Sequence, residues 1–186
     1  MESVKPEDIQ YRHFKLEDKV ETLQKLIEVE LSEPYSIYLY RHFAIDYPEL
    51  SLVAVHNSTI VGAILGKFED MTKGDGKKPA SEPVQTEETL ALTGRKGYIA
   101  MIAVLPSYRK KNIGKTLVKM FIDECAKNNC DFVQLETETC NQGALRLYES
   151  CGFIRTKYHK KYYQNGNDAY RLRYYLKSIN LSDKDS

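Results

Sequence analysis

The sequence lacks both a long apolar run and a strong excess of either charge. Its longest apolar runs, such as residues 60–65, fall far short of the roughly 20 residues that a membrane-spanning helix needs. Lysine and arginine number 27 and aspartate and glutamate 26, so the net charge of +1 provides no field that would hold a polyanion. Residues 1–10 are too charged for a signal peptide. We therefore expect neither a membrane nor nucleic acid as a principal partner.

Cysteine is also scarce, and its spacing fits no metal site. The four cysteines are separated by 5, 10 and 11 residues, which matches neither a CxxC pair nor a zinc framework. We therefore expect reduced thiols, no metal cofactor and a cytoplasmic location. Cys140 could alternatively be an acyl-accepting nucleophile, but no histidine lies near it in sequence to activate the thiol.

The first half of the chain alternates between strand and helix patterns. A length of 186 residues suits one domain with a substantial core. A strand pattern at 9–14 precedes apolar residues at helical spacing in 20–31, and a second helix can begin at Pro34. The β-rich runs 50–55 and 59–68 predict a hairpin. A strand, two helices and an antiparallel pair therefore open the domain.

The second half resumes the sheet after a polar insert. Residues 69–96 are rich in Lys, Gly, Pro, Glu and Thr, which predicts a flexible insert within a sheet. The elements predicted after it are a strand at 98–104, a helix at 113–125, a strand at 132–136, a helix at 142–151 and a hairpin of 153–163 with 169–176. We expect one domain over residues 1–177 and a polar tail at 178–186.

Residues 109–115 form the first segment with chemical potential. They read Arg-Lys-Lys-Asn-Ile-Gly-Lys and lie between an apolar strand and the start of a helix, where unpaired N–H groups and the helix dipole favour an anion. Gly114 permits close approach of the backbone to a phosphate, and Asn112 tolerates the left-handed conformation. A solvated, charged loop is the alternative, and this segment alone does not decide between the two.

The second segment is residues 141–153. Asn141, Ala144 and Tyr148 stand at i, i+3 and i+7, so they share one face of a helix. A small residue between two polar ones leaves a slot for a thin ligand. The alternative for Tyr148 is a core tyrosine whose hydroxyl is satisfied locally.

Together, the two segments resemble a known signature. The pattern RxxNxG at 109–114 followed by NxxALxLYxxxGF at 141–153 resembles the motifs of GNAT acetyltransferases, whose first motif is usually [QR]xxGx[GA]. Residues 32–43, 135–139 and 144–155 resemble segments of the catalytic subunit of NatC, a complex that acetylates protein amino termini. The resemblance covers about residues 9–177. Asn112 departs from the motif, which usually has glycine at this position. The asparagine adds a side chain where the backbone approaches the phosphate.

The resemblance implies a fold and an activity. It implies a single α/β (α+β) GNAT domain, with a mixed seven-stranded sheet, about four flanking helices and a splay between the fourth and fifth strands. It implies transfer of acetyl from acetyl-CoA to protein amino termini that begin with Met and a large apolar residue. The partners implied are those amino-terminal segments and two auxiliary subunits, with ribosome association through the latter. A lysine or small-amine acetyltransferase of the same fold and a non-catalytic acyl-CoA-binding subunit remain alternatives.

The resemblance also implies which residues contact the cofactor. Main-chain groups of one strand hold the pantetheine arm, the turn at 109–115 wraps the pyrophosphate, and Tyr148 protonates the departing coenzyme A thiolate. The implied cofactor residues are Ile102, Ala103, Val104, Arg109, Lys110, Lys111, Asn112, Ile113, Gly114, Lys115, Asn141, Ala144 and Tyr148.

A proton acceptor is expected at the end of the fifth strand. An α-amino group has a pKa of about 8 and lysine about 10.4, so a carboxylate acting through water suffices for an amino terminus. Glu136 and Glu138 share one strand face by the two-residue period. NatC-like enzymes carry a glutamate at the position of Glu136, which favours Glu136 over Glu138.

Two further regions are implied to recognise the peptide. The corner of the first two helices carries Glu33, Pro34, Tyr35 and Tyr38, where a carboxylate could meet the substrate amine and rings could line an apolar pocket. The loop between the last two strands carries Tyr162 and Tyr163, whose hydroxyls could bind peptide backbone. The alternative for the corner is tyrosines that simply pack on the core.

Overall fold

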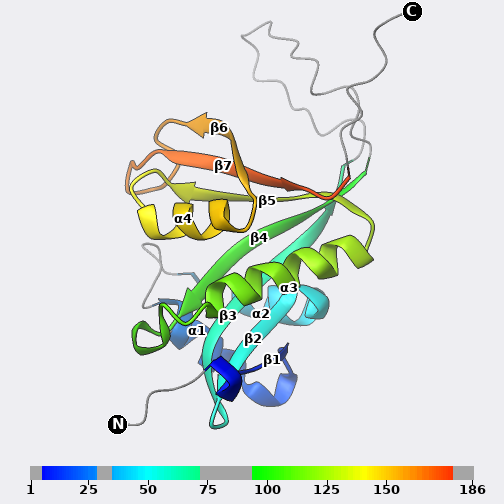
Figure 1. Ribbon diagram of the computed structural model, residues 1–186, viewed down its shortest axis with the longest axis vertical. Helices are drawn as coiled ribbons and strands as arrows, with labels where there is room; N and C mark the ends of the chain where they lie inside the picture. The colour runs from blue at the N-terminus through cyan, green and yellow to red at the C-terminus, as the bar shows by residue number, and fades with distance from the viewer. Residues whose placement is uncertain (1–5, 29–34, 72–93, 178–186) are drawn as a thin grey trace, which may run out of the picture.

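One mixed sheet organises the protein. The computed structural model describes residues 6–28, 35–71 and 94–177. Within them, seven strands lie in the order β1-β2-β3-β4-β5-β7-β6 (Figure 1). The strands are Gln10–His13 (β1), Ser51–His56 (β2), Thr59–Asp70 (β3), Arg95–Val104 (β4), Cys130–Glu138 (β5), Ile154–His159 (β6) and Ala169–Tyr175 (β7). The α-helices are Val20–Glu28 (α1), Ile37–Asp46 (α2), Ile113–Lys127 (α3) and Gln142–Ser150 (α4). These elements confirm the predicted architecture.

Helices cover both faces of the sheet, which explains why β2 is apolar at successive positions. Leu52 and Ala54 point into a core shared with α3 and α4. Val53 and Val55 point the other way, into a core shared with α1 and α2. Alternate side chains of one strand therefore fill two cores, because a strand covered on both faces needs apolar residues throughout.

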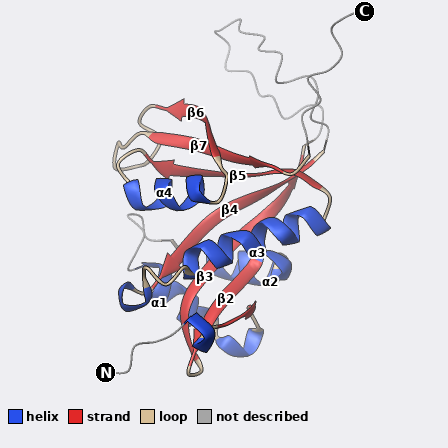
Figure 2. Cartoon of the chain, in the orientation of Figure 1, coloured by secondary structure: helices blue, strands red, loops and turns tan. Residues whose placement is uncertain are grey.

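The sheet opens between β4 and β5. These two strands pair in parallel only from Arg95 with Cys130 to Tyr98 with Gln134. Both continue beyond this point, to Val104 and Glu138, and diverge as they do so (Figure 2). The predicted splay is therefore confirmed, and it leaves room between the carboxyl ends of the two strands.

Several element boundaries differ from the sequence-based expectation. Helix α2 begins at Ile37 after Ser36, not at Pro34, which lies outside the described residues. Strands β3 and β4 reach into the predicted insert, because ion pairs join Glu69 to Lys96 at 2.8 Å and Asp70 to Arg95 at 3.4 Å across the ladder. Strand β6 ends at His159 rather than at residue 163. Residues 72–93 of the insert and the tail at 178–186 lie outside the described residues.

Gly66 allows α3 to pack closely on the sheet, which leads to a prediction of stability. A Cβ at Gly66 would lie 2.3 Å from the Tyr98 carbonyl oxygen and 2.5 Å from the Phe121 ring. Gly66→Ala should therefore lower the free energy of unfolding by about 3 kcal/mol, measured by urea denaturation. Gly143→Ala is the matched control, because its nearest neighbour, Asn141 Oδ1, is 3.7 Å away. Equal unfolding midpoints for the two variants would contradict this packing account.

Candidate active site

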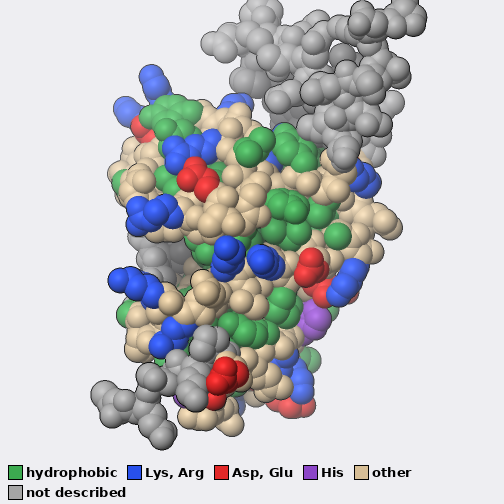
Figure 3. Space-filling view, viewed as in Figure 1, with side chains coloured by type: hydrophobic (Ala, Val, Ile, Leu, Met, Phe, Trp, Pro, Cys, Tyr) green, Lys and Arg blue, Asp and Glu red, His purple; other side chains and the backbone are tan. Residues whose placement is uncertain are grey.

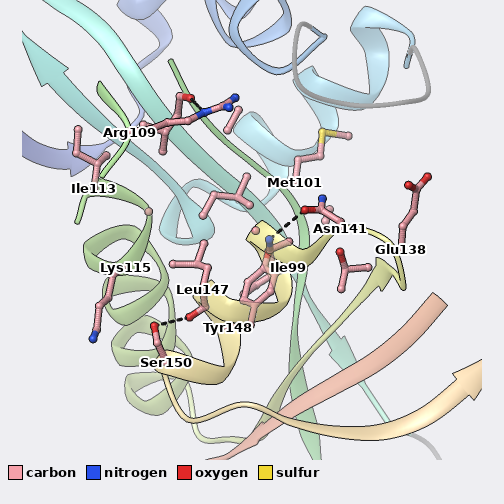
Figure 4. A pocket seen from close by; sticks show the side chains of 18 of the residues that line it. Ile99, Met101, Arg109, Ile113, Lys115, Glu138, Asn141, Leu147, Tyr148 and Ser150 are labelled. Carbon is pink, nitrogen blue, oxygen red and sulfur yellow. Dashed lines mark hydrogen bonds between the residues drawn. The ribbon is translucent and has the colours of Figure 1, made fainter. Parts of the chain in front are cut away.

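A cavity of about 700 Å³ occupies the space between the diverging strands. Its walls come from β4, the turn before α3, the first part of α4 and the end of β5 (Figure 4). All of the predicted cofactor residues except Lys111 line this cavity. They are Ile102, Ala103, Val104, Arg109, Lys110, Asn112, Ile113, Gly114, Lys115, Asn141, Ala144 and Tyr148. The two motifs that lie apart in the sequence therefore meet at one cavity.

The turn before α3 has the backbone shape that the motif requires. Asn112 has φ 62° and ψ 9°, a left-handed conformation that asparagine tolerates better than most residues. Lys110 also has a positive φ, of 60°. Gly114 packs against α4, since a Cβ there would lie 3.3 Å from Leu147 Cδ2. The asparagine that replaces the usual motif glycine thus retains the backbone shape of a turn suited to phosphate.

Asn141 begins α4 at the cavity wall. Its side-chain Oδ1 accepts a hydrogen bond from the backbone N–H of Ala144 at 3.0 Å, as Figure 4 shows. This is an amino-terminal helix cap, which satisfies one of the N–H groups that a helix start leaves unpaired. Because Oδ1 serves the cap, any bond from this side chain to a ligand would be donated by Nδ2.

Tyr148 lies about two turns further along α4 and is almost entirely buried. Its side chain is 4% exposed, and its ring packs edge-on against Phe153 with centroids 5.5 Å apart. Burial raises the pKa of Tyr148, because the phenolate would lose its hydration. The hydroxyl therefore remains protonated at neutral pH and is able to donate a proton or a hydrogen bond into the cavity.

Glu136 contributes a buried carboxylate from β5. Its side chain is 4% exposed, and its Oε1 accepts hydrogen bonds from Arg171 Nε at 2.6 Å and Gln134 Nε2 at 3.2 Å. The phenol of Tyr98 is also hydrogen-bonded to Glu136, and burial together with this carboxylate raises the pKa of Tyr98. The carboxylate is thus held by Tyr98 of β4, Gln134 of β5 and Arg171 of β7.

Sequence reasoning missed Tyr98 and Arg171. Arg171 faces Glu136 directly in the β5–β7 ladder, and Tyr98 stands at the last paired position of β4 with β5. A correct register for the two predicted strands would have placed Arg171 opposite Glu136. The register was not readable because many residues separate these strands in the chain.

The thiol of Cys140 is hydrogen-bonded to the carboxylate of Glu138. Cys140 Sγ donates to Glu138 Oε2 at 3.3 Å, and this hydrogen bond is the main reason that the pKa of the thiol is raised. A nucleophilic cysteine needs a lowered pKa. The geometry therefore disfavours the alternative of an acyl-accepting Cys140.

The residues predicted to recognise peptide occupy different environments. Tyr35 and Tyr163 line the cavity, and the burial of Tyr163 raises its pKa. Tyr162 packs edge-on against Tyr163 at 5.2 Å and is 46% exposed. Tyr38 is 75% exposed on α2, outside the cavity lining, so its role stays a prediction. Glu33 and Pro34 lie outside the described residues.

Charge and metal-binding groups are distributed without a dominant cluster. Lys and Arg side chains lie interspersed with neutral residues on the face shown in Figure 3. In the three described ranges, no group of His, Cys, Asp and Glu side chains is arranged to hold a metal ion. Every helix in the described part of the chain is too short or too polar to span a membrane.

Comparison with known proteins identifies the class. Residues 18–153 match the Acetyltransferase (GNAT) family. The chain therefore belongs to the GNAT acetyltransferase family, which confirms the family expected from the two motifs.

Within that family, the chain is similar to amino-terminal acetyltransferases. The chain is 41% identical, over 91% of its length, to N-alpha-acetyltransferase 30 of Xenopus laevis and of Homo sapiens. It spans only 55% and 41% of those two proteins. N-alpha-acetyltransferase 30 of Saccharomyces cerevisiae is 39% identical, over 84% of this chain and 81% of the relative.

Solved structures agree with this placement. A chain in the crystal structure of the NatC complex bound to Gag peptide and CoA superposes with a TM-score of 0.77 and 37% identity, over 91% of this chain and 99% of that one. Arabidopsis thaliana Naa50, in complex with the bisubstrate analogue CoA-Ac-MVNAL, gives a TM-score of 0.71 and 25% identity, over 92% and 99%.

Proposed function

We propose that this protein transfers the acetyl group of acetyl-CoA to the α-amino group of protein amino termini, as the catalytic chain of a NatC-type assembly. The observation that carries the proposal is the meeting of Glu136, Tyr148 and the turn at 109–115 on one cavity. The identity to N-alpha-acetyltransferase 30 over most of the chain supports the choice of acceptor.

Acetyl-CoA fits the features of the cavity. Residues 102–104 of β4 lie unpaired with β5, so their main-chain groups on that side are available to the amide groups of the pantetheine arm. The turn at 109–115, with its left-handed residues and the start of α3, suits the pyrophosphate. The bound arm would run from this turn towards Asn141 and Tyr148, with the thioester nearest Tyr148.

The transfer step then needs one proton acceptor and one donor. The substrate amine attacks the thioester carbonyl carbon, a C–N bond forms, and the C–S bond breaks. Glu136 accepts the amine proton through water, and Tyr148 donates a proton to the departing thiolate. Two observations support these assignments: Arg171 fixes the carboxylate of Glu136, and burial keeps the phenol of Tyr148 protonated.

The acceptor's path to the thioester is placed beside two tyrosines from distant parts of the chain. Tyr35 precedes α2 and Tyr163 follows β6, and both line the cavity. Aromatic rings at this opening favour an extended chain end with apolar first side chains over a bulky folded surface. We therefore assign substrates that begin with Met followed by Leu, Ile or Phe. Two auxiliary subunits, ribosome association through them and a cytoplasmic location belong to the same proposal. The similarity to a chain of the NatC complex supports assembly with other subunits.

A peptide series tests this acceptor preference. Peptides that differ only at the second residue, Met-Leu against Met-Asp, should differ in kcat/KM by about a hundredfold, because the apolar opening leaves the aspartate desolvated and unpaired. Peptides beginning Ser-Leu should have a lower kcat/KM than peptides beginning Met-Leu. Equal kcat/KM for Met-Leu and Met-Asp would overturn the specificity while leaving the acetyltransferase assignment intact.

A further inference from the structure

The loop between β6 and β7, residues 160–168, places a tyrosine at the cavity. Tyr163 is the residue of this loop that lines the cavity. The backbone N–H groups of Tyr162 and Tyr163 both donate to the Asn167 carbonyl oxygen, at 2.9 and 3.1 Å. Gly166 N–H in turn donates to the Tyr163 carbonyl oxygen at 2.9 Å. The position of Tyr163 is therefore tied to that of Asn167.

An asparagine side chain links the middle of this loop to β5, in addition to the backbone bond from Thr139 N–H to the Asp168 carbonyl oxygen at 2.9 Å. Asn165 Oδ1 accepts from the Asn167 backbone N–H at 2.9 Å, and Asn165 Nδ2 donates to Glu138 Oε1 at 2.9 Å. The second bond spans 27 positions in the chain and ends on a carboxylate that itself lines the cavity. An unbroken series of hydrogen bonds thus runs from Glu138 through Asn165 and Asn167 to Tyr163.

The carboxylate of Glu138 is occupied on both oxygens. Oε1 accepts from Asn165, and Oε2 accepts from Cys140 Sγ at 3.3 Å. Glu136, by contrast, is the more deeply buried carboxylate and is fixed by the positively charged Arg171. The two glutamates share a strand face, yet their partners differ in kind: Glu138 bonds to a loop residue, and Glu136 bonds to residues of the sheet.

We propose that Glu138 and Asn165 form a clamp that positions Tyr163 at the peptide side of the cavity, and that Glu138 is a positioning residue rather than the proton acceptor. The proposal rests on the proposed function, because it assigns Tyr163 to peptide recognition. Arg171 and Gln134 hold Glu136 from β7 and β5 independently of this loop, so a loosened loop would weaken productive peptide binding more than the chemical step and would leave the cofactor site unchanged. The clamp therefore acts on the KM for peptide.

A reciprocal exchange tests the clamp. Asn165→Asp removes the donor and places a second carboxylate against Glu138. The KM for a Met-Leu peptide should therefore rise about tenfold or more. The kcat should fall less than about threefold, and the KM for acetyl-CoA should stay unchanged. Combining Asn165→Asp with Glu138→Gln restores a donor and an acceptor in exchanged positions. The double variant should return the KM for peptide to within about threefold of the original value.

The same variants have a readout that does not depend on activity. Hydrogen exchange at the Tyr162 and Tyr163 amides should accelerate in Asn165→Asp and slow again in the double variant, whatever the protein acetylates. Asn57→Asp, the same chemical change in the β2–β3 turn, is the control and should alter neither readout.

Two results would overturn the clamp. The first is exchange at Tyr162 and Tyr163 that Asn165→Asp leaves unchanged. The second is a kcat that falls about a hundredfold in the double variant, which would make Glu138 the proton acceptor. Failure of the proposed function gives a different pattern: no transfer to the Met-Leu peptide by the original protein, with the exchange pattern still as expected.

Discussion

Glu136→Gln should lower kcat by about a hundredfold or more while the KM for peptide changes less than about threefold. Glutamine keeps the shape and can still accept the hydrogen bond that Arg171 Nε donates at 2.6 Å. It cannot accept a proton at neutral pH, so the loss falls on the chemical step. The measurement is steady-state kinetics with a Met-Leu peptide at saturating acetyl-CoA.

The control for Glu136→Gln is Glu149→Gln. Glu149 lies on α4 outside the cavity lining and pairs with Arg155 at 2.7 Å, with its side chain 40% exposed. This variant removes a carboxylate from an ion pair without touching the site, so kcat should stay within about twofold. If Glu136→Gln retained full kcat across pH, the carboxylate would have no role in proton transfer.

Tyr148→Phe is expected to have the second large effect, a fall in kcat of about a hundredfold. Removing the hydroxyl leaves the ring packed on Phe153 and removes the proposed proton donor to the departing thiolate. Burial raises the pKa of Tyr148, so the phenol stays protonated as pH rises through neutrality and its titration should not limit the rate there. The affinity for coenzyme A, measured by calorimetry, should change little.

Tyr174→Phe separates this chemical role from packing. The centroid of the Tyr174 ring lies 5.7 Å from that of the same Phe153 ring, and Tyr174 does not line the cavity. Its kcat should remain within about twofold of the original. Equal losses in Tyr148→Phe and Tyr174→Phe would mean that the hydroxyl of Tyr148 acts only through packing.

Local patterns predicted much of the frame and the cofactor side of the cavity. The apolar spacing of residues 113–125 lies within α3, and the motif at 141–153 matches α4 with its cap at Asn141. These segments are readable because a helix face and its cap depend on residues a few positions apart. Asn112 was readable for the same reason, since its left-handed φ is a property of one residue.

The acceptor side depends on contacts between distant segments. Arg171 meets Glu136 across 35 positions, and Asn165 meets Glu138 across 27. Neither pairing can be read from periodicity, because each requires the strand register and the shape of the loop after β6. The start of α2 was misplaced because proline favours a helix start, whereas Ser36 has an extended backbone and the helix begins at Ile37.

The most direct test of the account is acetyl transfer to three acceptors measured in parallel, using the protein isolated with its bound partners. The acceptors are a peptide beginning Met-Leu, the same peptide with a blocked amino terminus and a free internal lysine, and a small polyamine. The account predicts turnover of the first peptide alone. Comparable transfer to the blocked peptide or the polyamine would contradict amino-terminal specificity, and coenzyme A binding without transfer to any acceptor would contradict the enzymatic role itself.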